Sequence, residues 1–312
     1  MTRARLVIHG LRAADPGVRE AVKLVRDSGV DLDVRVTWED GDATHFAREA
    51  LQAGYDRVIA GGGDGTVNEV LAGMIDCRLA ATAVSTTALA ILPLGTANDF
   101  ARSVGIPLQD PAAALTFACT AAPSMVDVGC VNDRLFLNVA SGGFGADVTN
   151  RTPPQLKKAL GGLAYSLVGI ATALELVPYQ CTLQSSDGTN PPTEQFDVAI
   201  LAVGNGRQAG GGYQVTPRAK LTDGLLDLVL VPAVEVSNWM ALAGEYMNPG
   251  QEALEHLIYR QLDAFALSFD RDLTLNLDGQ PLVATEFQFR VLRGVLPLVI
   301  PADDINCGAM LS

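Results

Sequence analysis

At residues 58–70 the chain reads VIAGGGDGTVNEV, in which an apolar run precedes four glycines and one aspartate within five residues. The apolar run predicts a buried strand, and the apolar periodicity after Thr66 predicts a helix that this residue opens. A strand, a glycine loop and a helix in this order are typical of a phosphate-binding site. Glycines let backbone N–H groups approach an anion, and a helix N-terminus favours negative charge. A tight strand–helix turn without a ligand is the alternative interpretation.

Asp64 sets this loop apart from the common phosphate loops. The loop lacks the Lys-Ser/Thr ending of a Walker A motif and the third glycine of G-x-G-x-x-G. A carboxylate beside a polyphosphate is repelled unless a divalent cation or a proton transfer involves it. The loop therefore predicts that Asp64 takes part in one of those two processes.

Composition excludes several classes of function. The chain has 312 residues, 48% of them hydrophobic, which is enough for two domains with full cores. Its formal net charge of −13 argues against a nucleic-acid partner and against general electrostatic attraction to anionic membranes. The five scattered cysteines form no C-x-x-C and predict free thiols in a reducing cytoplasm. No apolar run is long enough for a membrane span, so membrane contact would be peripheral.

The first 125 residues alternate between strand and helix patterns. Strands are expected at 6–8, 32–36, 58–60 and 90–93, and helices at 16–28, at 42–53, after the glycine loop and at 111–120. Asp15 and Asp42 are expected to cap the first two helices. This alternation predicts a parallel sheet with ligands at the carboxyl ends of its strands. Thr37 and residues 61–66 fall at such ends.

Strand patterns dominate after residue 125. Strands are expected at 125–131, 134–139, 180–184, 196–203, 225–231, 264–269, 273–277, 287–292 and 296–300, with helices near 160–176 and 236–252. They predict an antiparallel β-sandwich. We expect an α/β domain at 1–128, which residues 290–312 can rejoin, and a sandwich domain at 129–289.

Four further segments combine glycines with polar residues. In LGTANDF, residues 94–100, Thr96 is placed to cap a helix or to donate to a phosphate. In GNGRQAGGG, residues 204–212, Arg207 is placed to reach a phosphate, with a hairpin turn as the alternative. Asp223-Gly224 suits either a hard-cation site or a type I′ turn, and residues 276–281 favour a hairpin turn. His9 ends the first strand, where a contact with a nucleotide edge is an option beside a structural role.

Two of these segments resemble a known family. GGGDGTVNEV followed by LPLGTANDFAR resembles the diacylglycerol-kinase-type lipid kinases, which share a superfamily with sphingosine kinases, NAD kinases and phosphofructokinases. LGTANDFAR separates the lipid kinases from the NAD kinases. RVTWEDGDA, GNGRQAGGG, LTDGLLDL and NLDGQPL look closer still to the bacterial YegS-like lipid kinases. These segments span essentially the whole chain in order. The resemblance therefore implies a nucleotide-binding, NAD kinase/phosphofructokinase-like α/β domain followed by an antiparallel β-sandwich that binds lipid and metal.

The resemblance also implies substrates and site residues. ATP with Mg²⁺ would be the phosphoryl donor, and the acceptor would be the hydroxyl of a lipid such as diacylglycerol or phosphatidylglycerol, met transiently at a membrane surface. Asp64 and Asp99 would lie near the transferred phosphate. A metal, Mg²⁺ or alternatively Ca²⁺, would be held by Asp223 and backbone groups of Lys220 and Leu225. A homodimer is left open. The expected ATP contacts are Thr37, Gly63, Asp64, Gly65, Thr66, Val67, Asn68, Glu69 and Thr96.

One position departs from the family pattern. The family's general base is the glutamate of a D-G-E-P turn, whereas this chain has Gln280 after Asp278 and Gly279. A general base contributes about 10²–10⁴-fold to a rate, although phosphoryl transfer rests mainly on positioning and electrostatics. Three outcomes follow: a weak kinase, a kinase that uses Asp64 or another carboxylate as its base, or a nucleotide- or lipid-binding protein without turnover.

Two more hypotheses concern other substrates and the membrane. A kinase of soluble metabolites, of the NAD-kinase type, is a rival that LGTANDFAR disfavours. Lys157 and Lys158 precede a largely uncharged segment, which predicts either a helix packed on the sandwich or an interfacial helix.

Overall fold

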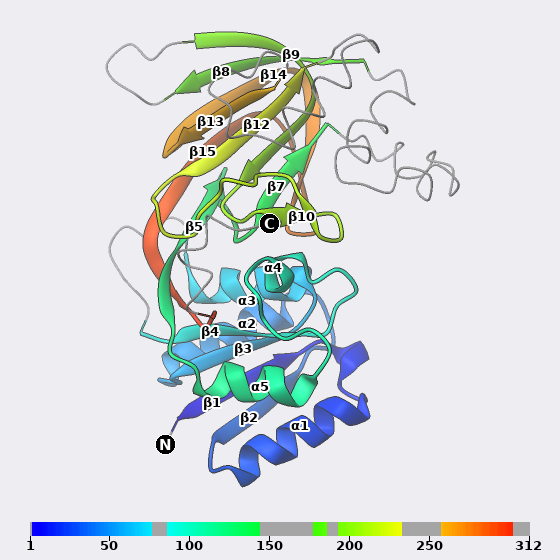
Figure 1. Ribbon diagram of the computed structural model, residues 1–312, viewed down its shortest axis with the longest axis vertical. Coiled ribbons are helices and arrows are strands. Elements are labelled where there is room, and N and C mark those ends of the chain that lie inside the picture. The colour runs from blue at the N-terminus through cyan, green and yellow to red at the C-terminus, as the bar shows by residue number, and fades with distance from the viewer. Residues whose placement is uncertain (1, 77–85, 144–176, 186–192, 233–256, 302–312) are drawn as a thin grey trace, which may run out of the picture.

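The computed structural model describes residues 2–76, 86–143, 177–185, 193–232 and 257–301. Figure 1 shows an α/β part below and a part made of strands above. The α/β part contains four parallel strands: β1 (Arg3–Ile8), β2 (Asp31–Val36), β3 (Arg57–Gly62) and β4 (Ala88–Pro93). Its helices are α1 (Pro16–Asp27), α2 (Asp42–Gln52), α3 (Asp64–Met74), α4 (Asp99–Ser103) and α5 (Pro111–Thr120), with a 3₁₀ turn, η1 (Gly10–Arg12), after β1.

Helices cover both faces of the parallel sheet, which explains the continuous apolar runs of its strands. Helices α1 and α5 pack together on one face, and α2 and α3 pack together on the other. Successive residues of one strand serve the two cores. Leu6 and Ile8 of β1 belong to the core beneath α1 and α5, while Val7 between them belongs to the core beneath α2 and α3.

The strand order creates a place for a ligand. The order is β4-β3-β1-β2, so the chain runs from β1 to β2 on one side and then returns past β1 to β3 on the other side. At such a switch point the connections after neighbouring strands diverge and leave a crevice beyond the carboxyl ends. The glycine loop after β3 and the segment His9–Gly10 after β1 both lie at this edge.

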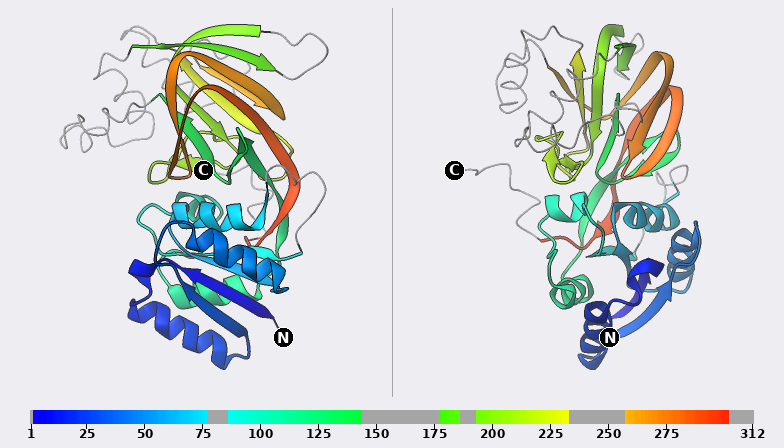
Figure 2. Two further views of the ribbon diagram at one scale, coloured as in Figure 1. Left: turned by 180° about the vertical axis from the view of Figure 1, so that it is seen from behind. Right: turned by 90° about the vertical axis from the view of Figure 1, so that its right-hand side faces the viewer.

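The upper part is an antiparallel β-sandwich, as the sequence predicts (Figure 2). Strands β13, β12, β9, β7 and β14 follow one another in the sheet, and β8 pairs with both β9 and β14. Among the described residues, the core contains five phenylalanines in ring contact, Phe136, Phe265, Phe269, Phe287 and Phe289. The strands are β5 (Ser124–Val131), β6 (Arg134–Phe136), β7 (Val139–Gly142), β8 (Tyr179–Ser185), β9 (Thr193–Gly204), β10 (Gln208–Ala209), β11 (Tyr213–Gln214), β12 (Leu226–Pro232), β13 (Ile258–Leu262), β14 (Ala264–Leu277) and β15 (Gln280–Leu298).

Strand β15 joins the two parts. It pairs with β14 near its start, with β5 along its second half, and in parallel with β4 at Leu298. Figure 1 shows this orange-to-red strand running from the upper part down to the α/β part. The α/β domain and the sandwich therefore share one continuous sheet. The predicted domain limits, 1–128 and 129–289, stay a prediction.

Three helix starts differ from expectation. Helix α3 begins at Asp64 rather than Thr66, because a carboxylate in the first turn suits the helix dipole. Helix α2 is capped by Gly41, while the Asp42 carboxylate accepts hydrogen bonds from the preceding amides of Trp38 and Glu39. Helix α4 follows Asn98 in the left-handed conformation, so Thr96 does not cap it. The predicted Asp15 cap of α1 is confirmed.

Three strand predictions also change. The strand expected at 134–139 is split into β6 and β7, because the amides of Leu137 and Asn138 bond to the Asp278 carboxylate instead of a strand neighbour. Residues 264–277 form one strand with a register shift after Ser268. Residues 287–292 and 296–298 belong to the single strand β15, whose register against β5 shifts between Leu292 and Leu296. A register shift of this kind interrupts the alternation of apolar and polar residues, so the sequence pattern predicts two strands where the structure has one.

Cysteine chemistry and membrane spans complete the comparison. Cys119 and Cys181 are buried free thiols, as expected, whereas Cys130 in β5 is disulfide-bonded, so the prediction of free thiols is wrong there. Within the described ranges, no helix is long and apolar enough to cross a membrane. The helices expected near 160–176 and 236–252, with Lys157 and Lys158, lie outside the described residues.

Candidate functional site

A cavity of about 400 Å³ lies at the switch point of the parallel sheet. It brings together Thr37, Thr66 and Glu69, which the sequence predicts as ATP contacts. Burial raises the pKa of Glu69, and the charge of Asp40 adds to this rise. The cavity is lined by His9, Gly10, Leu11, Val36, Thr37, Trp38, Glu39, Asp40, Ala43, Thr66 and Glu69.

The first turn of α3 is open for an anion. The amides of its first residues have no intrahelical partner, and a Cβ added to Gly65 would meet no atom within 4 Å. Behind this open side the backbone is tightly packed. A Cβ on Gly95 would lie 2.5 Å from the Cα of Gly63, and one on Gly62 would lie 2.3 Å from the Thr66 hydroxyl. The two predicted glycine segments therefore support each other and leave the amides of α3 accessible.

Asp64 caps a second helix. Its two carboxylate oxygens accept hydrogen bonds of 3.1 Å from the backbone amides of Asp99 and Phe100, the first two residues of α4. Helix α4 has no side-chain cap of its own, since Asn98 instead bonds back to Gly95. The aspartate of the first glycine segment thus fixes the helix of the second. The remaining lone pairs of the carboxylate stay available for a cation or a hydroxyl.

Asp99 connects α4 to the sandwich domain. Its carboxylate accepts hydrogen bonds from the amides of Gly211 and Gly212, with the shortest at 2.6 Å. Both glycines have positive φ, which lets the loop between β10 and β11 point two successive N–H groups at one carboxylate. The sequence predicts Asp99 beside the transferred phosphate, and the structure places its carboxylate in this contact between the domains.

The turn between β14 and β15 reaches the start of α3. Asp278 and Gly279 both have positive φ, and a Cβ on Gly279 would lie 3.9 Å from the amide nitrogen of Gly65. The Asp278 carboxylate accepts hydrogen bonds from the amides of Leu137, Asn138 and Val139. Burial raises the pKa of Asp278 to about 6, and the nearby charge of Asp64 adds to the rise. The predicted hairpin turn is confirmed.

Gln280 is held by an arginine. The Arg134 guanidinium on β6 donates to the Gln280 side-chain oxygen at 2.9 Å. Because guanidinium has only donors, this contact identifies the oxygen side of the amide, and the NH₂ group of Gln280 faces away from Arg134. At this position the chain therefore presents a hydrogen-bond donor where the family pattern has a carboxylate.

The predicted metal residues form an oxygen-rich loop before β12. The Asp223 carboxylate accepts a hydrogen bond from the Leu225 amide, and burial raises its pKa, with the charge of Asp127 adding to the rise. Two carboxylates near one another and backbone carbonyls fit a hard cation such as Mg²⁺ or Ca²⁺. Lys220 is exposed, and its positively charged side chain is not a ligand for a metal cation. Among the described residues, no three His, Cys, Asp or Glu side chains form a metal cluster, so such a site would depend on backbone oxygens.

The side chains of the other residues that the sequence predicts as phosphate or nucleotide contacts do not line the cavity at the switch point. The Val67 side chain belongs to the core beneath α3, and the side-chain NH₂ group of Asn68 donates to the carbonyl of Leu135 on β6. Thr96 is exposed at the tip of the loop that Asn98 closes. The Arg207 guanidinium donates to the carbonyl of Ala219. Val67 and Asn68 can therefore meet a nucleotide only through their backbone.

Sequence reasoning missed three residues. Asp127 accepts hydrogen bonds of 2.7 Å from the amides of Gly224 and Gly294 and so ties the Asp223 loop to β15. A carboxylate between the apolar residues of β5 is a signal that could have revealed it, because buried charges require partners. Asp278 could have been singled out as part of its Asp-Gly turn. Nothing in the sequence around Arg134 indicates its contact with Gln280.

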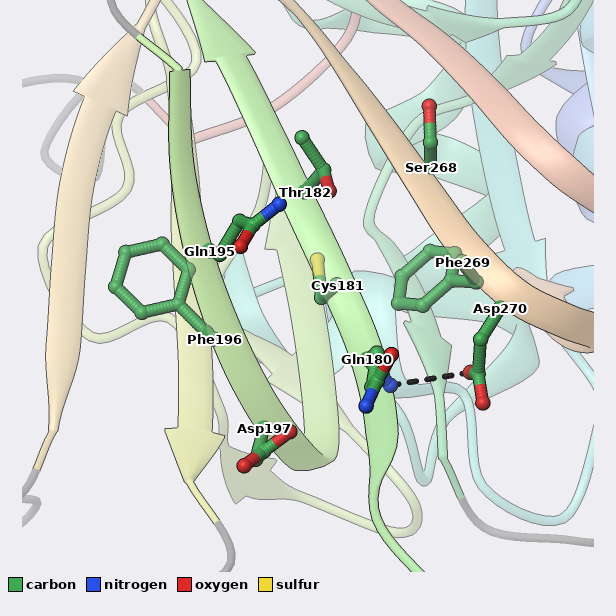
Figure 3. A pocket seen from close by; sticks show the side chains of 9 residues that line it. All are labelled: Gln180, Cys181, Thr182, Gln195, Phe196, Asp197, Ser268, Phe269 and Asp270. Atoms are coloured by element: carbon green, nitrogen blue, oxygen red, sulfur yellow. Dashed lines mark hydrogen bonds between the residues drawn. The ribbon is translucent and has the colours of Figure 1, made fainter.

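A second cavity, of about 450 Å³, lies on the sandwich among β8, β9 and β14. Figure 3 shows its polar side chains and the hydrogen bond of 3.0 Å from the Gln180 amide to Asp270. None of the site residues predicted from the sequence lines it. The lining residues are Gln180, Cys181, Thr182, Gln195, Phe196, Asp197, Ser268, Phe269 and Asp270.

Comparisons with known proteins agree with this arrangement. Residues 4–131 match the diacylglycerol kinase catalytic domain, and residues 138–300 match the YegS C-terminal NAD kinase β-sandwich-like domain. A probable YegS-like lipid kinase of Chromohalobacter salexigens is 46% identical over 95% of this chain and 92% of its own length. Another, from Klebsiella pneumoniae, is 42% identical over 96% of both chains.

Solved structures show the same fold. The crystal structure of a candidate diacylglycerol kinase from Bacillus anthracis superposes with a TM-score of 0.74, at 25% identity and over 96% of both chains. With two family matches in order and relatives above 40% identity over nearly the full length, the chain belongs to the family of the YegS-like probable lipid kinases, in which a diacylglycerol kinase catalytic domain precedes a YegS-type β-sandwich.

Proposed function

We propose that this protein is a lipid kinase that transfers the γ-phosphate of ATP to a hydroxyl of a lipid such as diacylglycerol or phosphatidylglycerol. One observation carries the proposal: the cavity lined by Thr37, Thr66 and Glu69 opens beside the first turn of α3, and the turn that bears Gln280 approaches that same helix end. The nucleotide, the phosphate-binding amides and Gln280 would thus meet at one edge of the sheet.

The chain's own residues would mainly bind and orient. The free amides at Asp64, Gly65 and Thr66 would receive the phosphates, because a helix N-terminus supplies donors and a favourable dipole. Phosphoryl transfer depends largely on such positioning and on neutralising charge. A bound Mg²⁺ would neutralise phosphate charge. Asp64 would hold it through the carboxylate lone pairs that the amides of Asp99 and Phe100 leave unused. Asp223 with the carbonyls of Lys220 and Leu225 would hold a second ion, Mg²⁺ or Ca²⁺, in the sandwich domain.

Gln280 cannot accept the proton of the acceptor hydroxyl, so a carboxylate elsewhere in the site would have to do so. Asp278 is a suitable acceptor, since a pKa of about 6 leaves it ionised at neutral pH yet basic enough to take a proton. Asp64, whose charge contributes to that pKa, is the alternative. Gln280 would then act as a donor that Arg134 orients toward the reacting oxygens.

A non-catalytic nucleotide- or lipid-binding protein is the second candidate. It is favoured by Gln280, which Arg134 holds in place. With this amide the chain has no carboxylate at the position where the family has one. Such a protein would use the same cavity and the same helix end. It would bind ATP and lipid without transferring phosphate.

A transfer assay separates these functions. Purified protein is incubated with ATP labelled in the γ-phosphate, Mg²⁺ and mixed micelles of diacylglycerol, phosphatidylglycerol or other hydroxyl lipids, with NAD as a soluble acceptor. Label in a lipid, and none in NAD, is expected. Binding of ATP without label in any acceptor would favour the non-catalytic function, and label in NAD would favour a metabolite kinase. The proposed transient contact with a membrane surface is tested in the same setting by flotation with vesicles.

A further inference from the structure

The cavity at the switch point has an apolar rim. Within the described ranges seven large hydrophobic side chains are exposed, and three of them, Leu11, Val36 and Trp38, line this one cavity. Trp38 is 92% exposed and Leu11 is 87% exposed. Scattered exposed apolar residues are ordinary, but several around one cavity mark a binding site.

Leu11 and Trp38 line that cavity from two different segments, which follow β1 and β2. Gly10 and Thr37, the residues just before them, are in close contact: the Gly10 amide donates to the Thr37 hydroxyl at 3.3 Å. A Cβ on Gly10 would lie 2.5 Å from the Thr37 carbonyl oxygen. The two segments that follow β1 and β2 are therefore in contact at Gly10 and Thr37, directly before the two apolar side chains.

A side chain accepts a hydrogen bond from the backbone of each segment. The Leu11 amide donates to the His9 ring nitrogen Nδ1 at 3.3 Å. The Trp38 amide donates to the Asp42 carboxylate at 2.7 Å. Both side chains are thus exposed on fixed backbone rather than on free loops. A site prepared in this way loses little conformational entropy when a flat ligand enters.

We propose that Leu11 and Trp38 form a clamp that holds the base of the nucleotide, with the indole ring stacked on the purine. This rests on the proposed use of ATP and adds residues that the sequence did not identify as contacts. The phosphates would then extend past Thr37 and Thr66 to the amides of α3. Every base has a π-face, so stacking on an aromatic ring suits it. Glu69 and His9, which line the same cavity, supply an acceptor and a donor for the polar edge of the base.

The charges around the rim favour a neutral base over a lipid surface. Glu39 and Asp40 are exposed beside Trp38 and line the cavity with Glu69. Anionic lipid headgroups would be repelled by this acidic rim. The adenine base is uncharged, and its amino group can donate to a carboxylate. The anionic part of the nucleotide would lie farther inside, at the helix end.

Fluorescence tests the clamp without relying on activity. The chain has two tryptophans, so the Trp239→Phe variant leaves Trp38 as the single indole. ATP and ADP are expected to quench its emission, whereas inorganic tripolyphosphate, which has no base, is not. By calorimetry, Trp38→Ala is expected to weaken ATP and ADP binding about tenfold or more and to leave tripolyphosphate binding unchanged. Leu11→Ala is expected to act in the same direction, and Trp38→Phe to keep most of the affinity.

Val177→Ala, which shortens another exposed apolar side chain, is the matched control and is expected to change no affinity. ATP binding with unchanged Trp38 emission and unchanged affinity in Trp38→Ala would overturn the clamp alone. Loss of vesicle binding in Trp38→Ala, with ATP affinity intact, would assign the rim to a lipid surface and also overturn it. Absence of ATP binding to the wild type would overturn the proposed function together with the clamp.

Discussion

Gln280 shows how one side chain can alter a site without changing its shape. Its oxygen accepts from Arg134, so its NH₂ group is the part left for the reacting groups. A glutamate has nearly the same size but would be an acceptor on both oxygens. It would pair with Arg134, which favours the ionised form. The difference between the two residues is therefore the loss of a proton acceptor rather than a loss of packing.

We expect Gln280→Glu to raise the rate of phosphoryl transfer to lipid by at least about tenfold, because a carboxylate at this position can take the proton of the acceptor hydroxyl. The initial rate of label transfer at saturating ATP measures it. Gln280→Met, which keeps the length without a polar group, is the control and should not accelerate transfer. A rate in Gln280→Glu that is unchanged or lower would show that position 280 does not limit catalysis.

Asp227 is not one of the candidate site residues, so its titration can be tested separately from the proposed activity. It is fully buried on β12, accepts the Tyr259 hydroxyl at 2.5 Å, and has a pKa raised to about 6 chiefly by burial. A carboxyl group with a raised folded-state pKa binds more protons in the folded state than in the unfolded state. Its ionisation therefore costs stability as pH rises from its ordinary value near 4 through about 6, by about 1.4 kcal/mol per pKa unit.

We expect Asp227→Asn to flatten the pH dependence of the free energy of unfolding between about pH 4 and 6. Urea unfolding at a series of pH values, compared with the wild type, measures this difference. The variant should lose least relative to the wild type at neutral pH, where the wild-type carboxylate is ionised. An identical pH profile in both proteins would show that Asp227 keeps an ordinary pKa.

At the scale of elements, helix α4 couples the phosphate loop to the sandwich. Asp64 at the start of α3 caps α4, and Asp99 at the start of α4 holds the loop between β10 and β11. Hydrogen bonds from amides to a carboxylate are stronger than neutral ones, and leaving buried amides without an acceptor is costly. The short helix therefore depends on both carboxylates for its place.

We expect Asp99→Ala to lower the free energy of unfolding by about 1–3 kcal/mol and to speed amide exchange at Gly211 and Gly212. Urea unfolding and hydrogen exchange measured by mass spectrometry give the two readouts. Asp110→Ala is a matched control, since Asp110 caps α5 through two amides far from this loop in the chain. It should reduce stability without changing exchange in the glycine loop. Equal exchange there in Asp99→Ala and the wild type would contradict the coupling.

At the scale of the whole molecule, β15 makes the two domains one cooperative structure. Its first residues pair with β14 in the sandwich, and Leu298 pairs with Leu89 of the parallel sheet. Asp127 adds a second tie, because its carboxylate binds the amides of Gly224 and Gly294. Unfolding either domain would remove strand partners from the other.

We therefore expect one unfolding transition rather than two. Hydrogen exchange of peptides from β3 and from β12, followed across a denaturant series, should give the same midpoint for both domains. Far-ultraviolet circular dichroism should follow the same curve. Two midpoints separated by more than the experimental error would show that β15 does not couple the domains.

Much of this molecule is predictable from the sequence, for reasons that are local. Continuous apolar runs predict β1, β3 and β4, because a parallel sheet is covered on both faces. Asp15 predicts the start of α1 through its own side chain, and Asp278-Gly279 predicts a hairpin because few residues accept positive φ. The glycine loop after β3 likewise predicts an anion site from short-range chemistry alone. The family resemblance, carried by contiguous motifs, predicted Thr37, Thr66 and Glu69 as ATP contacts, and the structure brings these three residues to one cavity.

Only the tertiary structure decided which polar groups meet. The cap of α4 comes from Asp64, 35 residues earlier in the chain, and the partner of Gln280 is Arg134, 146 residues away. Nothing in local spacing encodes such contacts, because they follow from how strands and helices are packed against each other. The same holds for Leu11 and Trp38, which line one cavity because β1 and β2 are adjacent in the sheet. Sequence determined the elements and the kind of chemistry, while the packing of distant segments determined the partners of each carboxylate.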